Sequence, residues 1–382
     1  MTTTKFSYSV RNLMLLAASM VALALSFAEA ATPIEIGRSL VLSGPLAPYG
    51  EAKRDGGDAY IEKINKAGGI NGRRIVLTTL DDAYDPAKTV ANLKKLAGEK
   101  RPSAFLGLFG VPTVAAALPV LEELRIPAVG LTSGSPALRT PLKKYVFPVR
   151  ASYVDEADYI VGHIKTLGYK RVSIIRQENP FGELVRNTLA EALNKEGIKI
   201  VSEAKLAPTA TDANEAVAAA VASKPDAIFL AMLSNGAVPT IESAKARGIL
   251  TPSLYAFSPV DASLLVDKLD KVASGLAITQ IVPLPSSTQA RIATEYTEAL
   301  KELGRGTPSF YGLEAFIEAK ILVAALQRAG RDAGDPEAVV RALEAMGDYD
   351  AGGFSVNYSK NLHRGAKFVE LTMIGSRGTV IR

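Results

Sequence analysis

The chain has 382 residues, of which 48% are hydrophobic and 22% are charged, and it contains no cysteine and only two histidines. This composition excludes a disordered chain, a disulfide, a thiolate metal site, a cysteine nucleophile and a multi-histidine metal site. The formal net charge of +5 includes no run of four lysines or arginines, so we expect a soluble surface and no nucleic-acid partner.

Residues 1–30 have the pattern of a secretory signal peptide. Lys5 and Arg11 precede an uncharged stretch over residues 12–28, and the small residues around Ala30 form a cleavage pattern. We therefore expect export to the periplasm with cleavage near Ala30. The alternative is an uncleaved membrane anchor, because the uncharged stretch approaches the length of a membrane span.

Short apolar runs then alternate with helical segments. We expect strands at residues 34–42, 74–80, 104–108 and 128–131. Helices are expected between them, at residues 51–66, 86–99 and 113–124. This alternation is typical of βαβ units, and it predicts a mostly parallel sheet with helices on both faces.

The same alternation restarts after Arg150 with a helical stripe over residues 154–167. Further strands are expected at residues 172–175, 198–204, 227–231, 253–257 and 275–279. Three Asx-Pro pairs indicate helix starts, at residues 85–86, 179–180 and 335–336. Asp212 and Glu215 resemble a capping box.

The remaining part of the chain is predicted to be mainly helical before it returns to strands. Long helices are expected at residues 288–303 and 310–329, and a short one at residues 336–346. Strand-like segments follow at residues 354–356 and 367–374. The sequence therefore predicts an α/β fold with two Rossmann-like lobes.

Motifs of the commoner enzymes and metal sites are weak in this sequence. The glycines of residues 68–72 precede a strand and indicate a turn, because a phosphate-binding loop precedes a helix. Asp81, Asp82 and Asp85 lack the spacing of a calcium loop; Asp85 is explained as a helix cap, and metal binding stays the minor alternative. We expect no metal and no cofactor.

A serine hydrolase is also disfavoured. Ser133 and Ser135 are candidate nucleophiles, but neither His163 nor His363 has a local triad signature, so we expect no enzyme.

The loops that follow the expected strands favour ligand binding instead. Ligands of open parallel sheets bind beyond the carboxyl ends of the strands, where helices begin and backbone amides are free. In the first block these loops are rich in Gly, Ser, Thr and Pro, at residues 43–49, 109–113 and 132–135. The equivalent loops of the second block are at residues 177–181, 234–237 and 257–261. Together they predict an anion pocket with aromatic walls.

Several stretches of the chain resemble a known family, the leucine/isoleucine/valine-binding family of periplasmic solute-binding proteins, type I fold, which serve ABC transporters. The most specific one runs from Ser43-Gly44-Pro45-Leu46-Ala47-Pro48-Tyr49-Gly50 to Ile64-Asn65-Lys66-Ala67-Gly68-Gly69-Ile70-Asn71-Gly72-Arg73. Looser matches are Asp81-Asp82, Asp85-Pro86, Pro148-Val149-Arg150, Asn179-Pro180-Phe181-Gly182 and Tyr311-Gly312-Leu313-Glu314-Ala315.

The resemblance implies two αβ lobes joined by three hinge crossings, with the ligand enclosed between them. Transferred to this chain, the first lobe comprises residues 31–149 and 283–352, and the second comprises residues 150–282 and 353–382. The crossings fall near residues 149–151, 279–282 and 352–355. The implied ligand-binding residues are Tyr49, Phe109, Val111, Thr113, Thr132, Ser133, Tyr153, Phe181, Asn235 and Phe257.

One departure from the family concerns the ligand's ammonium group. Amino-acid binders of the family place an acid in the loop that here reads Tyr255-Ala256-Phe257-Ser258-Pro259; the nearest acid is Asp261, which we interpret as a helix cap. Because a buried ammonium without a partner costs several kcal/mol, we expect a carboxylate or amide ligand with an apolar body and without an α-amine. Branched-chain amino acids remain the alternative.

The sequence therefore predicts a monomeric, periplasmic binding protein that delivers a small ligand to the inner-membrane permease of an ABC importer. A periplasmic ligand sensor of the same fold, which regulates a receptor, is the alternative from another class. A periplasmic enzyme is the third, and it would have to work without histidine- or cysteine-based nucleophiles.

Overall fold

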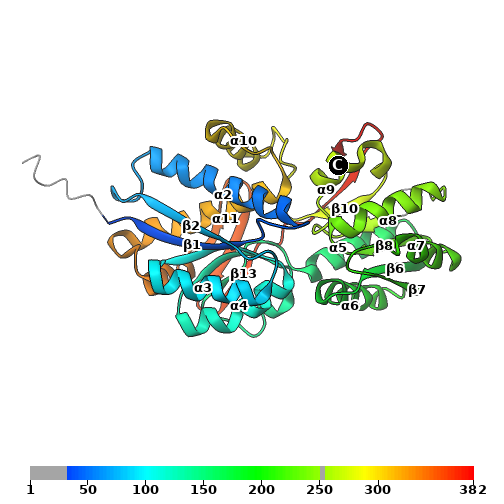
Figure 1. The fold of residues 1–382 in the computed structure, drawn as a ribbon, viewed down its shortest axis with the longest axis horizontal. Helices are drawn as coiled ribbons and strands as arrows, with labels where there is room; N and C mark the ends of the chain where they lie inside the picture. Colours follow the sequence, from blue (N-terminus) through cyan, green and yellow to red (C-terminus); the bar gives the residue numbers. More distant parts are fainter. Residues whose placement is uncertain (1–31, 250–253) are drawn as a thin grey trace, which may run out of the picture.

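The alternating strands and helices form two mostly parallel sheets that lie in separate lobes side by side (Figure 1). The structure is a computed structural model that describes residues 32–249 and 254–382. The predicted signal peptide, residues 1–30, lies outside the described residues. Over the described ranges, no helix combines the length and apolar character needed to cross a membrane.

The first lobe contains a five-stranded parallel sheet in the order β2-β1-β3-β4-β5. Its strands are β1 (Ile34–Leu40), β2 (Ile75–Asp81), β3 (Ala104–Phe109), β4 (Ala128–Thr132) and β5 (Val146–Phe147). Helices α3 (Pro86–Lys100) and α4 (Val111–Leu124) cover one face, and α2 (Ala47–Lys66) and α11 (Phe310–Ala329) cover the other (Figure 1). The remaining helices, which are shorter, are α10 (Arg291–Leu303) and α12 (Pro336–Glu344).

The second lobe is built on a seven-stranded sheet in the order β15-β14-β10-β9-β8-β6-β7. Its strands are β6 (Arg171–Gln177), β7 (Lys199–Leu206), β8 (Ala227–Ala231), β9 (Leu254–Ala256), β10 (Ala277–Gln280), β14 (Glu370–Ile374) and β15 (Val380–Ile381). Only β14 and β15 run antiparallel to their neighbours. Its helices are α5 (Tyr153–Thr166), α6 (Pro180–Lys195), α7 (Ala213–Ala222), α8 (Ser234–Ala246) and α9 (Ala262–Leu269).

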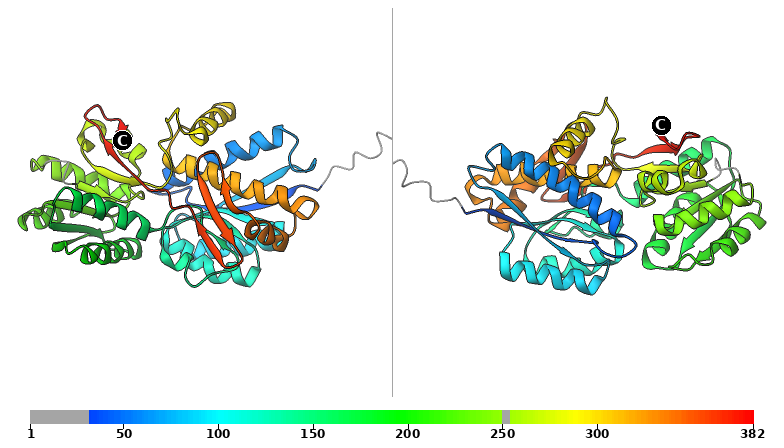
Figure 2. Two further views of the ribbon diagram at one scale, coloured as in Figure 1. Left: turned by 180° about the vertical axis from the view of Figure 1, so that it is seen from behind. Right: turned by 45° about the horizontal axis from the view of Figure 1, so that its top comes forward.

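The chain passes between the lobes three times, and the third passage differs in position from the sequence prediction. The first two passages follow β5 and β10. β11 (Gly347–Asp350), β12 (Ser355–Ser359) and β13 (Leu362–Gly365) form a separate antiparallel sheet on the first lobe, so the chain reaches the second sheet only after β13 (Figure 2). The predicted crossing at residues 352–355 therefore lies too early, because Tyr358 and His363 pack against β5.

Local capping signals account for most helix starts. The side chains of Asp85, Asn179 and Asp335 accept hydrogen bonds from the first backbone amides of α3, α6 and α12, as predicted. The capping box at Asp212 and Glu215 is wrong, because the Asp212 carboxylate accepts from the amide of Ala207 instead. This contact closes the loop before the helix and leaves the amides at the start of α7 without a side-chain cap.

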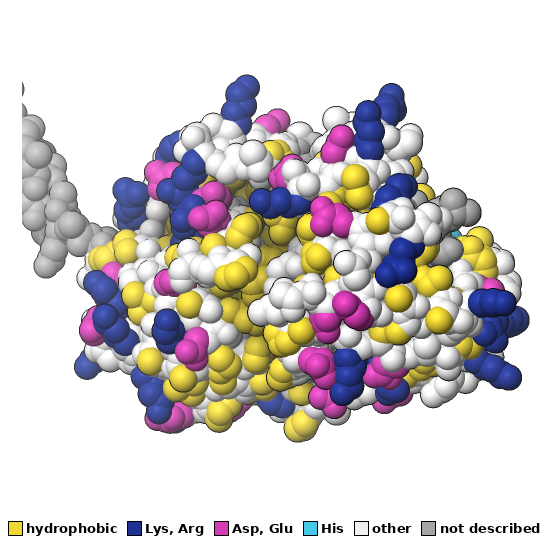
Figure 3. Space-filling model, turned by 45° about the vertical axis from the view of Figure 1, so that its right-hand side comes forward, with side chains coloured by type: hydrophobic (Ala, Val, Ile, Leu, Met, Phe, Trp, Pro, Cys, Tyr) yellow, Lys and Arg dark blue, Asp and Glu magenta, His cyan; other side chains and the backbone are white. Residues whose placement is uncertain are grey.

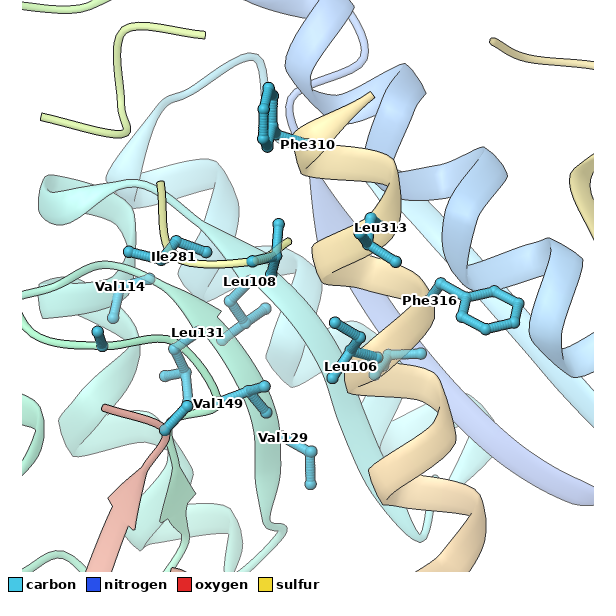
Figure 4. Packing of buried hydrophobic residues seen from close by; sticks show 14 of the residues in the cluster. Leu106, Leu108, Val114, Val129, Leu131, Val149, Ile281, Phe310, Leu313 and Phe316 are labelled. Carbon is cyan, nitrogen blue, oxygen red and sulfur yellow. The ribbon is translucent and has the colours of Figure 1, made fainter. Parts of the chain in front are cut away.

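The core of the first lobe lies between β3, β4 and α11. Every residue of these two strands is buried, and α11 buries residues on all of its sides, which explains why both strands are continuously apolar. Figure 4 shows Leu106 and Leu108 of β3 beside Leu313 of α11, with Phe316 turned toward α2. This rigid layer holds the carboxyl ends of β3 and β4 at the boundary with the second lobe.

Candidate ligand-binding site between the lobes

A cavity lies where the carboxyl ends of the strands of both lobes face each other. It is lined by loop and helix-start residues, namely Tyr84, Phe109, Gly110, Val111, Thr132, Arg150, Tyr153, Phe181, Leu233, Pro259 and Tyr311. The lobes are closed, and the cavity volume of about 10 Å³ is close to what one water molecule needs. A ligand therefore enters only after the lobes separate. Figure 3 shows hydrophobic side chains gathered along the boundary between the lobes, with charged residues around it.

Half of the residues predicted for the site line this cavity. They are Phe109, Val111, Thr132, Tyr153 and Phe181. Tyr49 and Phe257 stand directly behind the wall, where Tyr49 contacts Phe109 at 5.2 Å and Phe257 contacts Tyr153 at 6.1 Å between ring centroids.

The other three predicted residues do not reach the cavity. The Thr113 hydroxyl donates to the carbonyl of Gly110 within the first turn of α4. The Ser133 hydroxyl accepts from the amide of Ser135, and Asn235 is exposed at the start of α8.

Five helices begin at the cavity, which makes its electrostatic character positive. The lining residues Val111, Tyr153, Phe181, Leu233 and Tyr311 are the first or second residue, or the N-cap, of α4, α5, α6, α8 and α11. The amino end of each helix carries a partial positive charge from its free amides. An anionic group is therefore favoured at this position.

Two buried polar side chains at the cavity lack a hydrogen-bond partner for one atom. These atoms are Oγ1 of Thr132 and Nε of Arg150, within the part of the chain that the structure describes. Thr132 is 3% exposed and Arg150 is 2% exposed. Leaving a buried donor unpaired is costly, so both atoms are available to a ligand.

The nearby buried acids of the second lobe are hydrogen-bonded within that lobe. Both oxygens of Glu156 accept hydrogen bonds, from the amide and hydroxyl of Ser258 and the hydroxyl of Thr279, at 2.6–3.0 Å. Asp261 accepts from the amide of Ser263 at the start of α9, at 2.9 Å. Burial raises the pKa of Glu156, and it raises the pKa of Asp261 to about 6. Among the described residues, no acid lines the cavity.

The carboxylates of Asp81 and Asp82, for which metal binding is the minor alternative, have a structural role. Asp81 accepts from the amides of Leu42 and Ala83, and Asp82 accepts from the hydroxyls of Ser39 and Thr89. Over the described ranges, no group of three or more His, Asp or Glu side chains is arranged to hold a metal ion.

Tyr49 connects the two lobes through its hydroxyl. It donates to Oγ of Ser234 at 2.7 Å or to the carbonyl of Pro259 at 2.9 Å, and it accepts from the amide of Ser234 at 3.0 Å. Burial, with a smaller contribution from Asp261, raises the pKa of Tyr49, so the hydroxyl keeps its proton. Because Tyr49 belongs to α2 of the first lobe, these hydrogen bonds hold the lobes closed.

We expect the Tyr49→Phe variant to bind ligand about tenfold more weakly, because a lost hydrogen bond of this kind is worth about 1.4 kcal/mol. The loss is expected in the dissociation rate, since the hydroxyl stabilises the closed form only. Stopped-flow binding measures both rates. Tyr60→Phe, a change on the same helix where the ring packs on Phe316, is the matched control. Equal dissociation rates in the two variants would contradict the role of the Tyr49 hydroxyl in holding the lobes closed.

The residues predicted for the site did not include Tyr84, Arg150, Leu233 or Tyr311, and Pro259 was covered only by the predicted loop at residues 257–261. Arg150 and Tyr311 lie within stretches that carry the family resemblance, so their position at a lobe entry and at a helix start was a usable signal. Tyr84 follows β2 in a left-handed conformation, with φ of 64°, and no sequence pattern indicated that it turns toward the cavity.

Comparison with known proteins gives a consistent result. A family profile described as "Periplasmic binding protein" matches residues 33–379. A "Leu/Ile/Val-binding protein homolog 3" of Brucella melitensis is 30% identical over 52% of this chain, and the match spans 54% of that relative. "Leu/Ile/Val-binding protein BraC3" of Rhizobium johnstonii is 26% identical over 86% of this chain and 88% of its own length.

The fold has close counterparts among solved structures. A crystal structure of a substrate-binding periplasmic protein from Ralstonia solanacearum superposes with a TM-score of 0.85 at 30% identity, covering 91% of this chain and 99% of that one. The family profile spans nearly all of the described residues. The chain therefore belongs to the periplasmic binding protein family, and it is a solute-binding protein of the periplasm and not an enzyme.

Proposed function

We propose that this protein is the substrate-binding protein of an ABC importer and that it binds a small carboxylate or amide with an apolar body and no α-amine. The observation that carries the proposal is the charge pattern of the cavity. Arg150 and five helix starts face it, while Glu156 and Asp261 are hydrogen-bonded within the second lobe. This pattern favours an anion, and among the described residues the lining supplies no carboxylate to a cation.

In the part of the chain that the structure describes, no carboxylate lines the cavity, and this argues against α-amino acids as ligands. A buried ammonium without a partner costs several kcal/mol, whereas micromolar binding is worth about 8 kcal/mol in total. An amino-acid ligand would lose most of its affinity in such a cavity. Leu/Ile/Val-binding relatives show that the fold accommodates amino acids, and the difference proposed for this chain concerns the charged groups around the cavity.

The aromatic walls supply the apolar part of the recognition. Tyr84 and Tyr311 pack against Phe109 at 5.8 and 5.9 Å, and Tyr153 packs against Phe181 at 6.0 Å between ring centroids. Burying one aromatic ring of a ligand removes roughly 150 Å² from water, which contributes about 4 kcal/mol. Two or three hydrogen bonds to a charged carboxylate, at about 1.5–3 kcal/mol each, supply the remainder of a micromolar affinity.

Binding is coupled to closure of the lobes about the three crossings. The open form admits the ligand, and the Tyr49 hydrogen bonds are remade as the lobes close. Solute-binding proteins of this kind work with ABC permeases, so we propose that the closed complex docks as a monomer on an inner-membrane permease, after removal of residues 1–30.

Mass spectrometry of ligand released from the protein, purified from the periplasm without unfolding, tests the function. We expect a small monocarboxylic acid or amide with an apolar body. Uptake of that compound should be lost from cells in which the gene is deleted. Stoichiometric release of an α-amino acid would contradict the proposed ligand class, and unchanged uptake would contradict the transport role.

A further inference from the structure

Arg150 is the one basic side chain that lines the cavity, in the part of the chain that the structure describes. We propose that it determines ligand charge, so that the protein selects a carboxylic acid over the amide of the same body. This inference rests on the proposed function and narrows its ligand class. It assigns a specificity-determining role to a residue that the sequence analysis did not place in the site.

The position of Arg150 allows it to respond to lobe closure. The residue lies in the first crossing, between β5 and α5, and its side chain is 2% exposed. One terminal nitrogen, Nη2, donates to Oγ of Ser258 in the second lobe at 2.5 Å. Ser258 in turn donates to Glu156. The guanidinium is therefore fixed from the second-lobe side by a hydrogen-bonded chain.

The first-lobe side of the same guanidinium is incompletely satisfied. Nε of Arg150 lies 3.7 Å from Oε1 of Glu314, which is too long for a hydrogen bond, and both atoms are unpartnered among the described residues. Glu314 is 2% exposed and belongs to α11, one turn after the lining residue Tyr311. Glu314 thus balances the charge of Arg150 and orients it without using its Nε donor.

A ligand carboxylate fits the unused donors. A guanidinium presents its N–H groups in a planar fork that matches the two oxygens of a carboxylate. The unpartnered Oγ1 of Thr132 adds a hydroxyl donor from the end of β4, and the start of α4 at Val111 adds its positive end. These groups lie on the walls of one cavity, so one carboxylate reaches them when the lobes close.

An amide of the same shape would gain less from this arrangement. Its carbonyl oxygen accepts a hydrogen bond, but its neutral NH₂ group cannot pair with the Arg150 guanidinium, which has donors only. Charge-assisted hydrogen bonds are roughly twice as strong as neutral ones. We therefore expect the acid to bind at least tenfold more tightly than the amide, and we expect that ratio to depend on Arg150.

Calorimetry with 3-phenylpropanoate and 3-phenylpropanamide tests the inference on the mature chain. Removing Arg150 alone would leave the buried Glu314 with only the Lys53 ammonium as a counter-charge, 3.9 Å away and shared with Glu318. The variant is therefore the double change Arg150→Gln with Glu314→Gln, which removes the two charges together. Arg38→Gln is the matched control. Arg38 is also a buried arginine, 3% exposed, but it pairs with Asp58 on the first lobe and not at the cavity.

In the wild type and in Arg38→Gln we expect the acid to bind at least tenfold more tightly than the amide. In the double variant we expect the acid preference to fall to the share that the helix starts supply, while the amide affinity stays within about twofold, which also shows that the cleft is folded. An undiminished acid preference in the double variant would overturn the role of Arg150. Equal binding of acid and amide by the wild type would also overturn it but would leave the proposed function standing. If neither compound binds, 4-methylpentanoate and its amide take their place, and failure of both acids to bind would contradict both proposals.

A second readout uses the unmutated side chain. In a nitrogen–proton NMR spectrum of the arginine Nε–H groups, one resonance should shift further on addition of the acid than on addition of the amide, and it should be absent from the spectrum of Arg150→Lys. An Arg150 resonance that the acid leaves unmoved would overturn the inference even if the double variant does not fold.

Discussion

The Lys53→Met variant is expected to be less stable than the wild type by about 3–5 kcal/mol at pH 8. The Lys53 ammonium is 2% exposed and lies 2.9 and 3.0 Å from the two oxygens of Glu318 and 3.9 Å from Glu314. Removing the cation leaves two buried carboxylates on α11 facing methionine. The free energy of unfolding, from urea titrations followed by circular dichroism, measures the loss.

The loss is expected to shrink as the pH falls. Burial raises the pKa of Glu318 to about 7, although Lys53 acts to lower it. An acid whose folded-state pKa exceeds its unfolded value contributes stability below the unfolded pKa, and this contribution is lost as the pH rises through the folded pKa. At pH 5 Glu318 is protonated in the folded variant, so this side chain no longer buries an unpaired charge. The variant should therefore recover part of its stability between pH 8 and pH 5.

The double variant Lys53→Met with Glu318→Leu is the control for this prediction. It replaces the charged pair with apolar side chains of similar volume, which is often neutral or stabilising. We expect it to be more stable at pH 8 than Lys53→Met alone. Additive losses from the two changes, or a loss independent of pH, would contradict the account of the buried charges.

The Gly56→Ala variant is expected to lose about 3 kcal/mol of stability, at the upper end of the usual cost of overpacking. Gly56 lies in α2 where that helix crosses α11, and a Cβ atom there would stand 1.9 Å from the carbonyl oxygen of Gly312 and 2.6 Å from its carbon. Both atoms belong to the backbone, so no side-chain rotation relieves the clash. The two helices would have to move apart, and the urea unfolding midpoint should fall accordingly.

The matched control is the same substitution at a helical glycine whose Cβ position has no close neighbour. Gly162 lies in α5, and a Cβ atom placed there meets nothing within 4 Å. Because alanine is the better helix former, Gly162→Ala should stabilise the protein by about 0.5–1 kcal/mol. A similar loss in both variants would show that backbone approach is not the cause.

Most of the fold was predictable from the sequence because its signals are local. The continuous apolar runs of β3, β4 and β8 and the Asx-Pro starts of α3, α6 and α12 all appear within a few residues of their predicted positions. The third lobe crossing was not predictable in this way. β12 pairs with β11 on one side and with β13 on the other, and Tyr358 and His363 pack on β5. These packing contacts join segments about 210 residues apart.

The site was predictable where a residue lies at the end of a strand or at the start of a helix. Phe109 and Thr132 are the last residues of β3 and β4, Phe181 lies at the start of α6, and all three line the cavity. Arg150 depends on the path of the crossing and on its buried partner Glu314, which lies 164 positions further along the chain. Periodicity and composition carry no information about such a pair. The place of Arg150 on the cavity wall therefore follows only from the three-dimensional structure.

Isothermal calorimetry with two matched pairs of ligands tests the central claim most directly: leucine against 4-methylpentanoate, and phenylalanine against 3-phenylpropanoate. The members of each pair share a carboxylate and an apolar body and differ in the α-amine. The account predicts that at least one amine-free acid binds, and more tightly than its amino-acid partner. Tight binding of leucine or phenylalanine that disappears when the amine is removed would contradict it.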